Sequence, residues 1–341
     1  MKRFLIKIAY TVLPLWILFV GAYIYFIGYI EPNATGDLAV IGHLPLDKAH
    51  VYYPDQHNPL PILYEEIYDT AQIHDKFHQV LVIGDSFSQR GNGSFHNFLA
   101  RDGFTVANVT PSNLNFWNPI QCAYELMKRG IADSTCCRTL IIQTGERYLI
   151  SRLNQFSPDR QAATTKIKSR PAPTDTVKEE YHVKNPLIKT RDLIFCRLGI
   201  NDPVKKVRLT RPLFTCDEPD LLLFFDEDIT YEQSITETEG VRSKVNTIRA
   251  MARERGVNLV FLLAPDKYDL YQDFIVDNPY PRKTVNEDFR KIVGDDPHFI
   301  IGKELLLPLV KAGTKDVFIM DDTHWSCTTA ERVAEHIKPL L

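Results

Sequence analysis

The stretch QVLVIGDSF, residues 79–87, decides the fold class of this chain. Val80 to Ile83 form a continuous apolar run, and Gly84 and Asp85 make a tight turn after it. A short apolar run rich in branched residues is typical of a strand that is buried on both faces of a parallel sheet. In open parallel sheets, catalytic groups gather at the carboxyl ends of the strands. We therefore expect Ser86 at the functional edge of an α/β domain.

The same alternation continues along the chain. Further apolar, strand-like segments lie at 105–110, 138–145 and 257–265. Helical segments, recognised by apolar spacing or a glycine stop, lie at 94–103, 118–130, 240–256, 286–295 and 328–341. Strands that alternate with helices predict a mostly parallel central sheet with helices on both faces, a three-layer α/β fold.

The interval of about 150–235 breaks this alternation, and we interpret it as an insertion. Between Arg152 and Arg211 there are 14 Lys and Arg residues against 6 Asp and Glu. A basic insertion attracts an anionic polysaccharide or lipid headgroups, although a solvated basic surface explains the charge equally well.

Residues 8–30 carry no charge and follow Lys2, Arg3 and Lys7. As a helix this run would be about 34 Å long, enough to cross a bilayer, and it exceeds the apolar part of a typical signal peptide. We therefore predict a single-pass anchor rather than a buried core helix. The positive-inside rule then places the N-terminus in the cytoplasm and the remainder outside, in the periplasm of a Gram-negative cell.

Three parts result: a cytoplasmic tip and transmembrane anchor (1–30), a Pro-rich extracytoplasmic stalk packing on the domain (31–75), and a catalytic domain with the basic insertion (76–341). The 40 basic and 43 acidic side chains give a net charge of −3, which argues against a nucleic-acid partner. Six cysteines permit disulfides in an oxidising compartment, but their pairing stays open.

Two short motifs carry residues suited to nucleophilic catalysis. Ser86 follows the first strand, and Asp321, Asp322 and His324 precede the last helix. A serine nucleophile needs a base that accepts its proton and a carboxylate that orients this base. Each motif supplies what the other lacks.

The GDSF motif and the DTHW motif (322–325) resemble the SGNH (GDSL-like) hydrolase superfamily, and more narrowly its alginate O-acetyltransferase-related (AlgX/AlgJ-like) branch. GERYL at 145–149 and APDKY at 264–268 also fit this branch. The resemblance covers roughly residues 76–150 and 235–341, and it implies an SGNH-like fold.

The resemblance implies that Ser86 is the nucleophile, His324 the general base and Asp322 the orienting acid, with Asp321 as the alternative acid. It also suggests a tentative set of oxyanion or substrate-binding residues: Asp85, Phe87, Arg147, Lys267, Tyr271 and Trp325. No metal and no cofactor are implied.

The implied function is O-acetylation of polysaccharide hydroxyls through an acyl-enzyme. The acetyl donor would be supplied by a multi-spanning membrane acyltransferase. A carbohydrate acetylesterase of the same fold is the first alternative, and a non-catalytic glycan-binding subunit of an export complex is the second.

The chain also departs from the family pattern. DTHW follows the serine here, whereas it precedes the serine in the alginate enzymes, and this weakens transfer of the alginate-specific substrate. The superfamily's G-x-N-D block is replaced by GERY, and a literal GIND (199–202) with Asn201 lies in the insertion, where we interpret it as a coincidence. Backbone N–H groups near Ser86 are therefore the default oxyanion donors.

Overall fold

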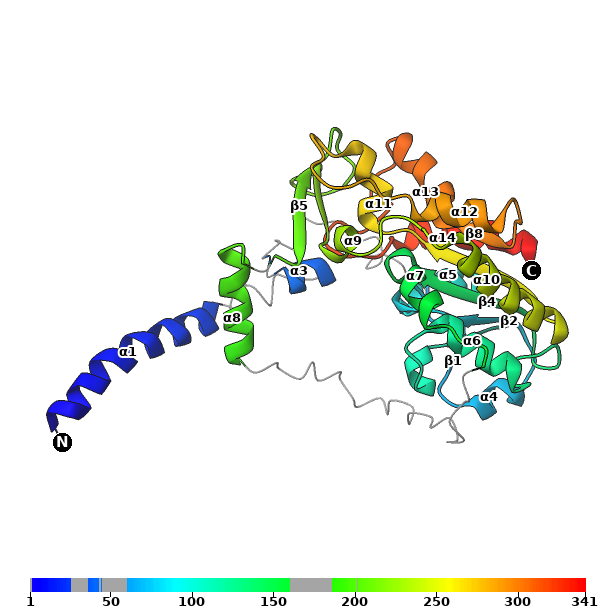
Figure 1. The fold of residues 1–341 in the computed structure, drawn as a ribbon, viewed down its shortest axis with the longest axis horizontal. Coiled ribbons are helices and arrows are strands. Elements are labelled where there is room, and N and C mark those ends of the chain that lie inside the picture. Colours follow the sequence, from blue (N-terminus) through cyan, green and yellow to red (C-terminus); the bar gives the residue numbers. More distant parts are fainter. Residues whose placement is uncertain (1, 26–35, 43, 45–59, 160–185, 201) are drawn as a thin grey trace.

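The computed structural model describes residues 2–25, 36–42, 44, 60–159, 186–200 and 202–341. The first element, α1 (Lys2–Tyr25), projects away from the rest of the molecule (Figure 1). Its segment Ile6–Tyr25 has a mean hydropathy of 1.8, is long enough to cross a membrane and is not buried in the protein. Such a helix is either a secretion signal or a membrane anchor.

The domain is built on a six-stranded sheet in the order β1-β3-β2-β4-β7-β8. All neighbouring strands in it are parallel. The strands are β1 (Glu65–Ile67), β2 (His78–Ile83), β3 (Val106–Val109), β4 (Cys137–Gly145), β7 (Asn258–Ala264) and β8 (Phe299–Ile301). Parallel pairing brings the carboxyl ends of β2, β4 and β7 to one edge of the sheet.

Two hydrophobic cores lie on the two faces of this sheet. Val80 and Val82 of β2 belong to one core, and Leu81 and Ile83 belong to the other, because successive strand residues point to opposite faces. The first core is completed by α5 (Phe95–Arg101), α13 (Gly302–Lys311) and α14 (Cys327–Ile337). The second is completed by α6 (Pro119–Lys128), α7 (Glu146–Gln155), α10 (Thr238–Glu254) and α12 (Val285–Val293). The predicted three-layer α/β fold is confirmed.

Two short strands were missed by the sequence analysis. β1 and β8 each have three residues, too few for a periodic pattern, and each pairs at an outer edge of the sheet. β1 lies within the predicted stalk, as does α4 (Thr70–Asp75), so this part of the stalk belongs to the domain. α3 (Asp37–Ile41), nearer the N-terminus, contributes Leu38 and Ala39 to the first core.

The insertion contains more regular structure than its composition suggests. It includes α8 (Pro186–Arg197) and an antiparallel hairpin of β5 (Val204–Arg208) and β6 (Leu221–Phe225), followed by α9 (Glu227–Thr230). Figure 1 shows α8 between α1 and the hairpin. Leu222, Leu223 and Phe224 are fully buried, so the hairpin is part of the core of the domain. In the described part of the chain, the thiols of Cys122, Cys136, Cys137, Cys196 and Cys216 are not in disulfides.

Candidate active site

Ser86 begins a short helical turn, η4 (Ser86–Ser88), directly after β2. The turn requires glycine at position 84, because a Cβ atom there would lie 2.1 Å from the Ser88 Oγ atom. The side chain of Ser86 is exposed. The strand end therefore presents this hydroxyl group to a molecule that approaches from solution.

Asp85 fixes the conformation of this turn. Its carboxylate accepts hydrogen bonds from the Gly145 N–H group at 2.7 Å, from the Phe87 N–H group at 3.3 Å and from Arg152 at 2.5 Å. Burial alone would raise the pKa of Asp85, but the Arg152 guanidinium and the hydrogen bonds hold it below its ordinary value. Asp85 therefore ties β2 to β4 and positions Ser86 at the sheet edge.

The loop of residues 319–326, here called the His324 loop, pairs His324 with Asp322. The Asp322 Oδ1 atom lies 2.5 Å from His324 Nδ1 and accepts a hydrogen bond from the His324 N–H group at 2.9 Å. Arg90 donates to Asp322 Oδ2 at 3.1 Å. Burial would raise the pKa of Asp322, but His324 and Arg90 together bring it far below its ordinary value. The carboxylate is thus ionised and faces the nitrogen that an orienting acid must face.

Phe87 connects the Ser86 turn to the His324 loop. Its ring centroid lies 4.8 Å from that of His324 and 4.6 Å from that of Trp325. The Nε2 atom of His324 is buried and has no hydrogen-bond partner among the described residues. Ser86 therefore lies beside the loop but is not hydrogen-bonded to His324, and such contacts often tighten only when substrate binds.

Asp321, the alternative acid, points toward a different partner. Its Oδ2 atom accepts a hydrogen bond from the Gly36 N–H group at 2.8 Å. Its backbone carbonyl accepts from the N–H groups of Leu38 and Ala39 at 3.0 and 3.2 Å. The two neighbouring aspartates thus have different partners. Asp322 contacts His324, and Asp321 accepts hydrogen bonds from the segment that begins α3.

Three of the tentative substrate-binding residues are buried rather than on an open surface: Lys267, Tyr271 and Trp325 are at most 1% exposed. Lys267 Nζ donates to the carbonyl oxygens of Ile319, Met320 and Asp322 at 2.7, 2.6 and 3.1 Å. Burial lowers the pKa of Lys267 to about 8.

Tyr271 accepts a hydrogen bond from the Phe318 N–H group at 3.4 Å, and Trp325 packs on Phe87. In this conformation Lys267 and Tyr271 support the loop from below, and Trp325 is a buried residue of the loop itself. Direct contact between these side chains and a polymer is inconsistent with their burial. Phe87 is likewise only 5% exposed and supports the loop from the side.

Arg147, also in the tentative set, lies in a buried ionic network at the ends of β4 and β7. Its guanidinium lies 3.0 Å from Asp228 and 3.3 Å from Asp266, and Lys283 lies 2.6 Å from Asp266. Burial raises the pKa of Asp228 to about 7 despite the nearby Arg147. With its side chain 7% exposed, Arg147 mainly holds the insertion, which supplies Asp228, against the sheet.

The raised pKa of Asp228 predicts a pH-dependent stability. The folded state retains this proton up to about pH 7, whereas an unfolded aspartate loses it near pH 4. The stabilising contribution is therefore complete at low pH and is lost as the pH rises toward 7. Between pH 5 and pH 8, the free energy of unfolding should therefore fall by about 2 kcal/mol more in the wild type than in Asp228→Asn. Urea denaturation at a series of pH values measures this difference.

Asp220→Asn is the matched control, since the side chain of Asp220, in the same insertion, is 40% exposed. It should leave the pH profile of the wild-type protein unchanged. Identical profiles for Asp228→Asn and the wild type would contradict this explanation.

Several contributors were not found by the sequence analysis. Arg90 carried no recognisable signal, although it stands four residues after Ser86. Gln143 accepts hydrogen bonds from the Asp85 N–H group and from Ser88 at 3.0 and 2.9 Å. A polar Gln143 directly after the apolar run of residues 140–142 in β4 was a signal that this edge contacts something polar.

Carboxylate oxygens of Asp37 and Asp322 and a ring nitrogen of His324 lie within 4.8 Å of one another, a spacing that also suits a metal ion. The guanidinium of Arg90 already supplies a positive charge beside Asp322. We therefore assign no metal ligands here.

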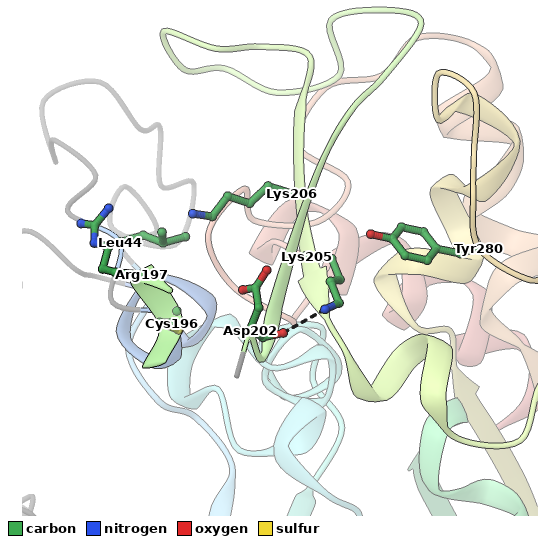
Figure 2. A pocket seen from close by; sticks show the side chains of 8 residues that line it. Leu44, Cys196, Arg197, Asp202, Lys205, Lys206 and Tyr280 are labelled. Carbon is green, nitrogen blue, oxygen red and sulfur yellow. Dashed lines mark hydrogen bonds between the residues drawn. The ribbon is translucent and has the colours of Figure 1, made fainter. Parts of the chain in front are cut away.

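A cavity of about 170 Å³ lies between α8 and the β5–β6 hairpin (Figure 2). Arg197, Lys205 and Lys206 make its lining basic, and Asp202 is the acidic member of the lining. Ser86 and His324 do not line it. These basic residues belong to the predicted insertion, whereas Asn201 of the GIND sequence lies outside the described residues.

Two comparisons with known proteins give partial matches to this chain. Residues 219–340 match the family model of the SGNH hydrolase-like domain of acetyltransferase AlgX. The chain is also similar to a probable alginate O-acetylase AlgJ of Pseudomonas fluorescens, with 33% identity over 116 residues. This stretch spans 33% of the chain but only 27% of that relative. No solved structure matches the chain.

Proposed function

We propose that this protein is a membrane-anchored, extracytoplasmic O-acetyltransferase that acts on polysaccharide hydroxyl groups. The match of residues 219–340 to the SGNH hydrolase-like domain of acetyltransferase AlgX supports this proposal. The observation that carries the proposal is the pairing of His324 with Asp322, which leaves His324 Nε2 without a partner among the described residues, beside the Ser86 turn. The family match includes the His324 loop but not Ser86. The role of Ser86 therefore rests on its position at the strand end.

The proposed reaction has two steps. In the first, Ser86 Oγ attacks the acetyl carbonyl carbon while His324 Nε2 accepts the serine proton. The bond to the donor's leaving group breaks, and the imidazolium returns the proton to that group. In the second, a sugar hydroxyl attacks the acetyl-serine and gives its proton to His324. The sugar ester forms, and Ser86 recovers its proton.

Asp322 keeps the proton of His324 on Nδ1, so that Nε2 presents a lone pair to the serine. Its ionised state is maintained by His324 itself and by Arg90. Within the Ser86 turn, the N–H groups of Phe87 and Ser88 already donate to Asp85. The Ser86 N–H group would therefore stabilise the oxyanion, a contribution of roughly 3 kcal/mol for a well-placed donor.

The proposal includes anchoring of the protein in a membrane by α1. The apolar surface of α1, which the protein leaves unburied, and the flanking Lys2, Arg3 and Lys7 support insertion with the N-terminus in the cytoplasm. The basic cavity in the insertion supports an acidic polysaccharide as the acceptor. A multi-spanning membrane acyltransferase is the proposed source of acetyl groups.

A carbohydrate acetylesterase is the second candidate, and one observation favours it. Ser86 is exposed, so water reaches the position where an acyl-enzyme would form. The same triad with water as the acceptor hydrolyses esters. A catalytically inactive glycan-binding subunit is the third candidate.

One experiment separates the three candidates. The full-length protein in detergent is incubated with an activated acetyl ester, with and without an acidic or a neutral oligosaccharide, and the sugars are examined by mass spectrometry. Acetylated sugar supports the transferase, and acetate release that is indifferent to sugar supports the esterase. If neither product forms while the oligosaccharide still binds, the enzyme proposal is wrong.

A further inference from the structure

The segment that begins α3 is docked onto the His324 loop. The N–H groups of Leu38 and Ala39 donate to the carbonyl oxygen of Asp321, and the Gly36 N–H group donates to its carboxylate. The side chains of Leu38 and Ala39 are fully buried in the first core. Residues nearly 300 positions apart in the chain therefore form one packed unit next to the candidate base.

Gly36 allows a very close approach of the two backbones. A Cβ atom at this position would lie 2.1 Å from the Asp321 carbonyl oxygen and 2.6 Å from its Oδ1 atom. Both the Asp321 backbone and its carboxylate would have to move to admit even a methyl group. The contact thus depends on glycine.

Asp37, the first residue of α3, binds Thr323, which lies between Asp322 and His324 in the loop. Its Oδ1 atom accepts a hydrogen bond from the Thr323 N–H group at 2.7 Å, and its Oδ2 atom accepts one from the Thr323 hydroxyl. The Oδ2 atom also lies 3.8 Å from His324 Nδ1. His324 Nδ1 therefore has carboxylate oxygens from two directions, Asp322 at 2.5 Å and Asp37 farther away.

Groups of both charges surround the Asp37 carboxylate. Asp37 faces the carboxylate of Asp322 and the ring of His324, and buried Lys267 lies below the loop. Arg90 donates a hydrogen bond to Asp322, and its Nη1 atom lies 3.4 Å from His324 Nδ1. Burial, and next the charge of Asp322, raise the pKa of Asp37. Keeping a carboxylate here has an energetic cost, which the two hydrogen bonds from Thr323 partly offset.

We propose that α3 is a positioning element of the active site, in which Asp37 orients the His324 loop and adds negative charge on the Nδ1 side of His324. This inference rests on the proposed function, because it takes His324 as the general base. Asp37 touches neither Ser86 nor the reacting atoms, so it is a positioning residue. In the chain, α3 is the next described helix after α1. The element proposed to complete the active site is therefore close in sequence to the apolar helix.

The test compares Asp37→Asn and Gly36→Ala in the full-length protein. The amide introduced by Asp37→Asn still accepts a hydrogen bond from Thr323 but carries no charge. We expect its kcat to fall roughly tenfold with little change in KM, and the acid limb of its kcat/KM profile to move to lower pH by about one unit. Gly36→Ala should lower kcat by roughly a hundredfold, because a misplaced loop spoils the geometry of attack.

Asp295→Asn removes an exposed carboxylate outside the described contacts of the site and serves as the charge control. Its kcat and pH profile should equal those of the wild type. A wild-type kcat and pH profile in Asp37→Asn, with Ser86→Ala inactive in the same assay, would overturn the positioning role and leave the proposed function standing.

A second readout does not depend on turnover. The titration of the His324 ring, followed by NMR with labelled histidine, should have its midpoint at lower pH in Asp37→Asn than in the wild type, because a nearby negative charge has been removed. If the wild type shows no acyl chemistry but this shift is present, the proposed function fails while the charge contact stands. An unshifted midpoint contradicts the inference in either case.

Discussion

Replacing Ser86 by alanine is expected to reduce acetyl transfer by at least about 10⁴-fold. The substitution removes the atom on which the acyl-enzyme would form in the proposed reaction. Binding and backbone oxyanion donors would account for the activity that remains. Transfer from an activated acetyl ester to an oligosaccharide measures the loss, and intact-mass analysis should detect an acetylated wild-type chain but no acetylated Ser86→Ala chain.

The variant should fold normally, since the side chain of Ser86 is exposed. The matched control is Ser112→Ala: Ser112 is also exposed and lies in η6 (Pro111–Leu114), the turn after the neighbouring strand β3. The Ser112→Ala variant should retain transfer within a factor of about two. Acetylation of the chain that persists in Ser86→Ala would show that another residue is the nucleophile.

Asp322→Asn is expected to lower kcat by about 10³–10⁴-fold. An amide at this position can donate a hydrogen bond to His324 Nδ1, which stabilises the wrong tautomer and leaves the proton on Nε2. It also removes the charge that stabilises the imidazolium formed during attack. The same assay gives kcat, and the thermal unfolding midpoint shows whether the loop remains folded.

Asp321→Asn distinguishes the two aspartates. An amide oxygen can still accept the hydrogen bond from the Gly36 N–H group, and the Asp321 carbonyl keeps its bonds to Leu38 and Ala39. We expect kcat to fall by less than about tenfold. The reverse order of effects would assign the orienting role to Asp321 and contradict the geometry of the His324 loop.

The sequence was most informative where an element is long and apolar. β2, β4 and β7 were predictable because each is a run of branched residues, and their carboxyl ends correctly pointed to one edge of the sheet. β1 was not predictable, because Glu65–Ile67 is short and gains its place only through pairing with β3. The motifs therefore predicted which loops meet. The short edge strands were not predictable, because they form only through tertiary contacts.

The side chains that surround the site were harder to predict than the loops that carry them. Lys267 follows a strand end, and this position suggested a cleft, but its ammonium group turns inward to three loop carbonyls. Asp37 has no local pattern that marks it, because its role arises from a contact with Thr323 across the whole chain. The local sequence indicates which residues follow a strand. Packing against distant parts of the chain determines where the side chains of those residues point.

The direct pairing of β4 with β7 has a consequence for how the chain folds. These strands are hydrogen-bonded neighbours over their lengths, yet residues 146–257 run between them and include the whole insertion. The entropy of closing such a loop grows only with the logarithm of its length, so the insertion lowers stability little. Contacts between distant residues slow folding, and until β7 arrives the apolar β4 exposes an unpaired edge that can template aggregation. The length of the insertion therefore affects the speed and yield of folding more than the stability of the folded protein.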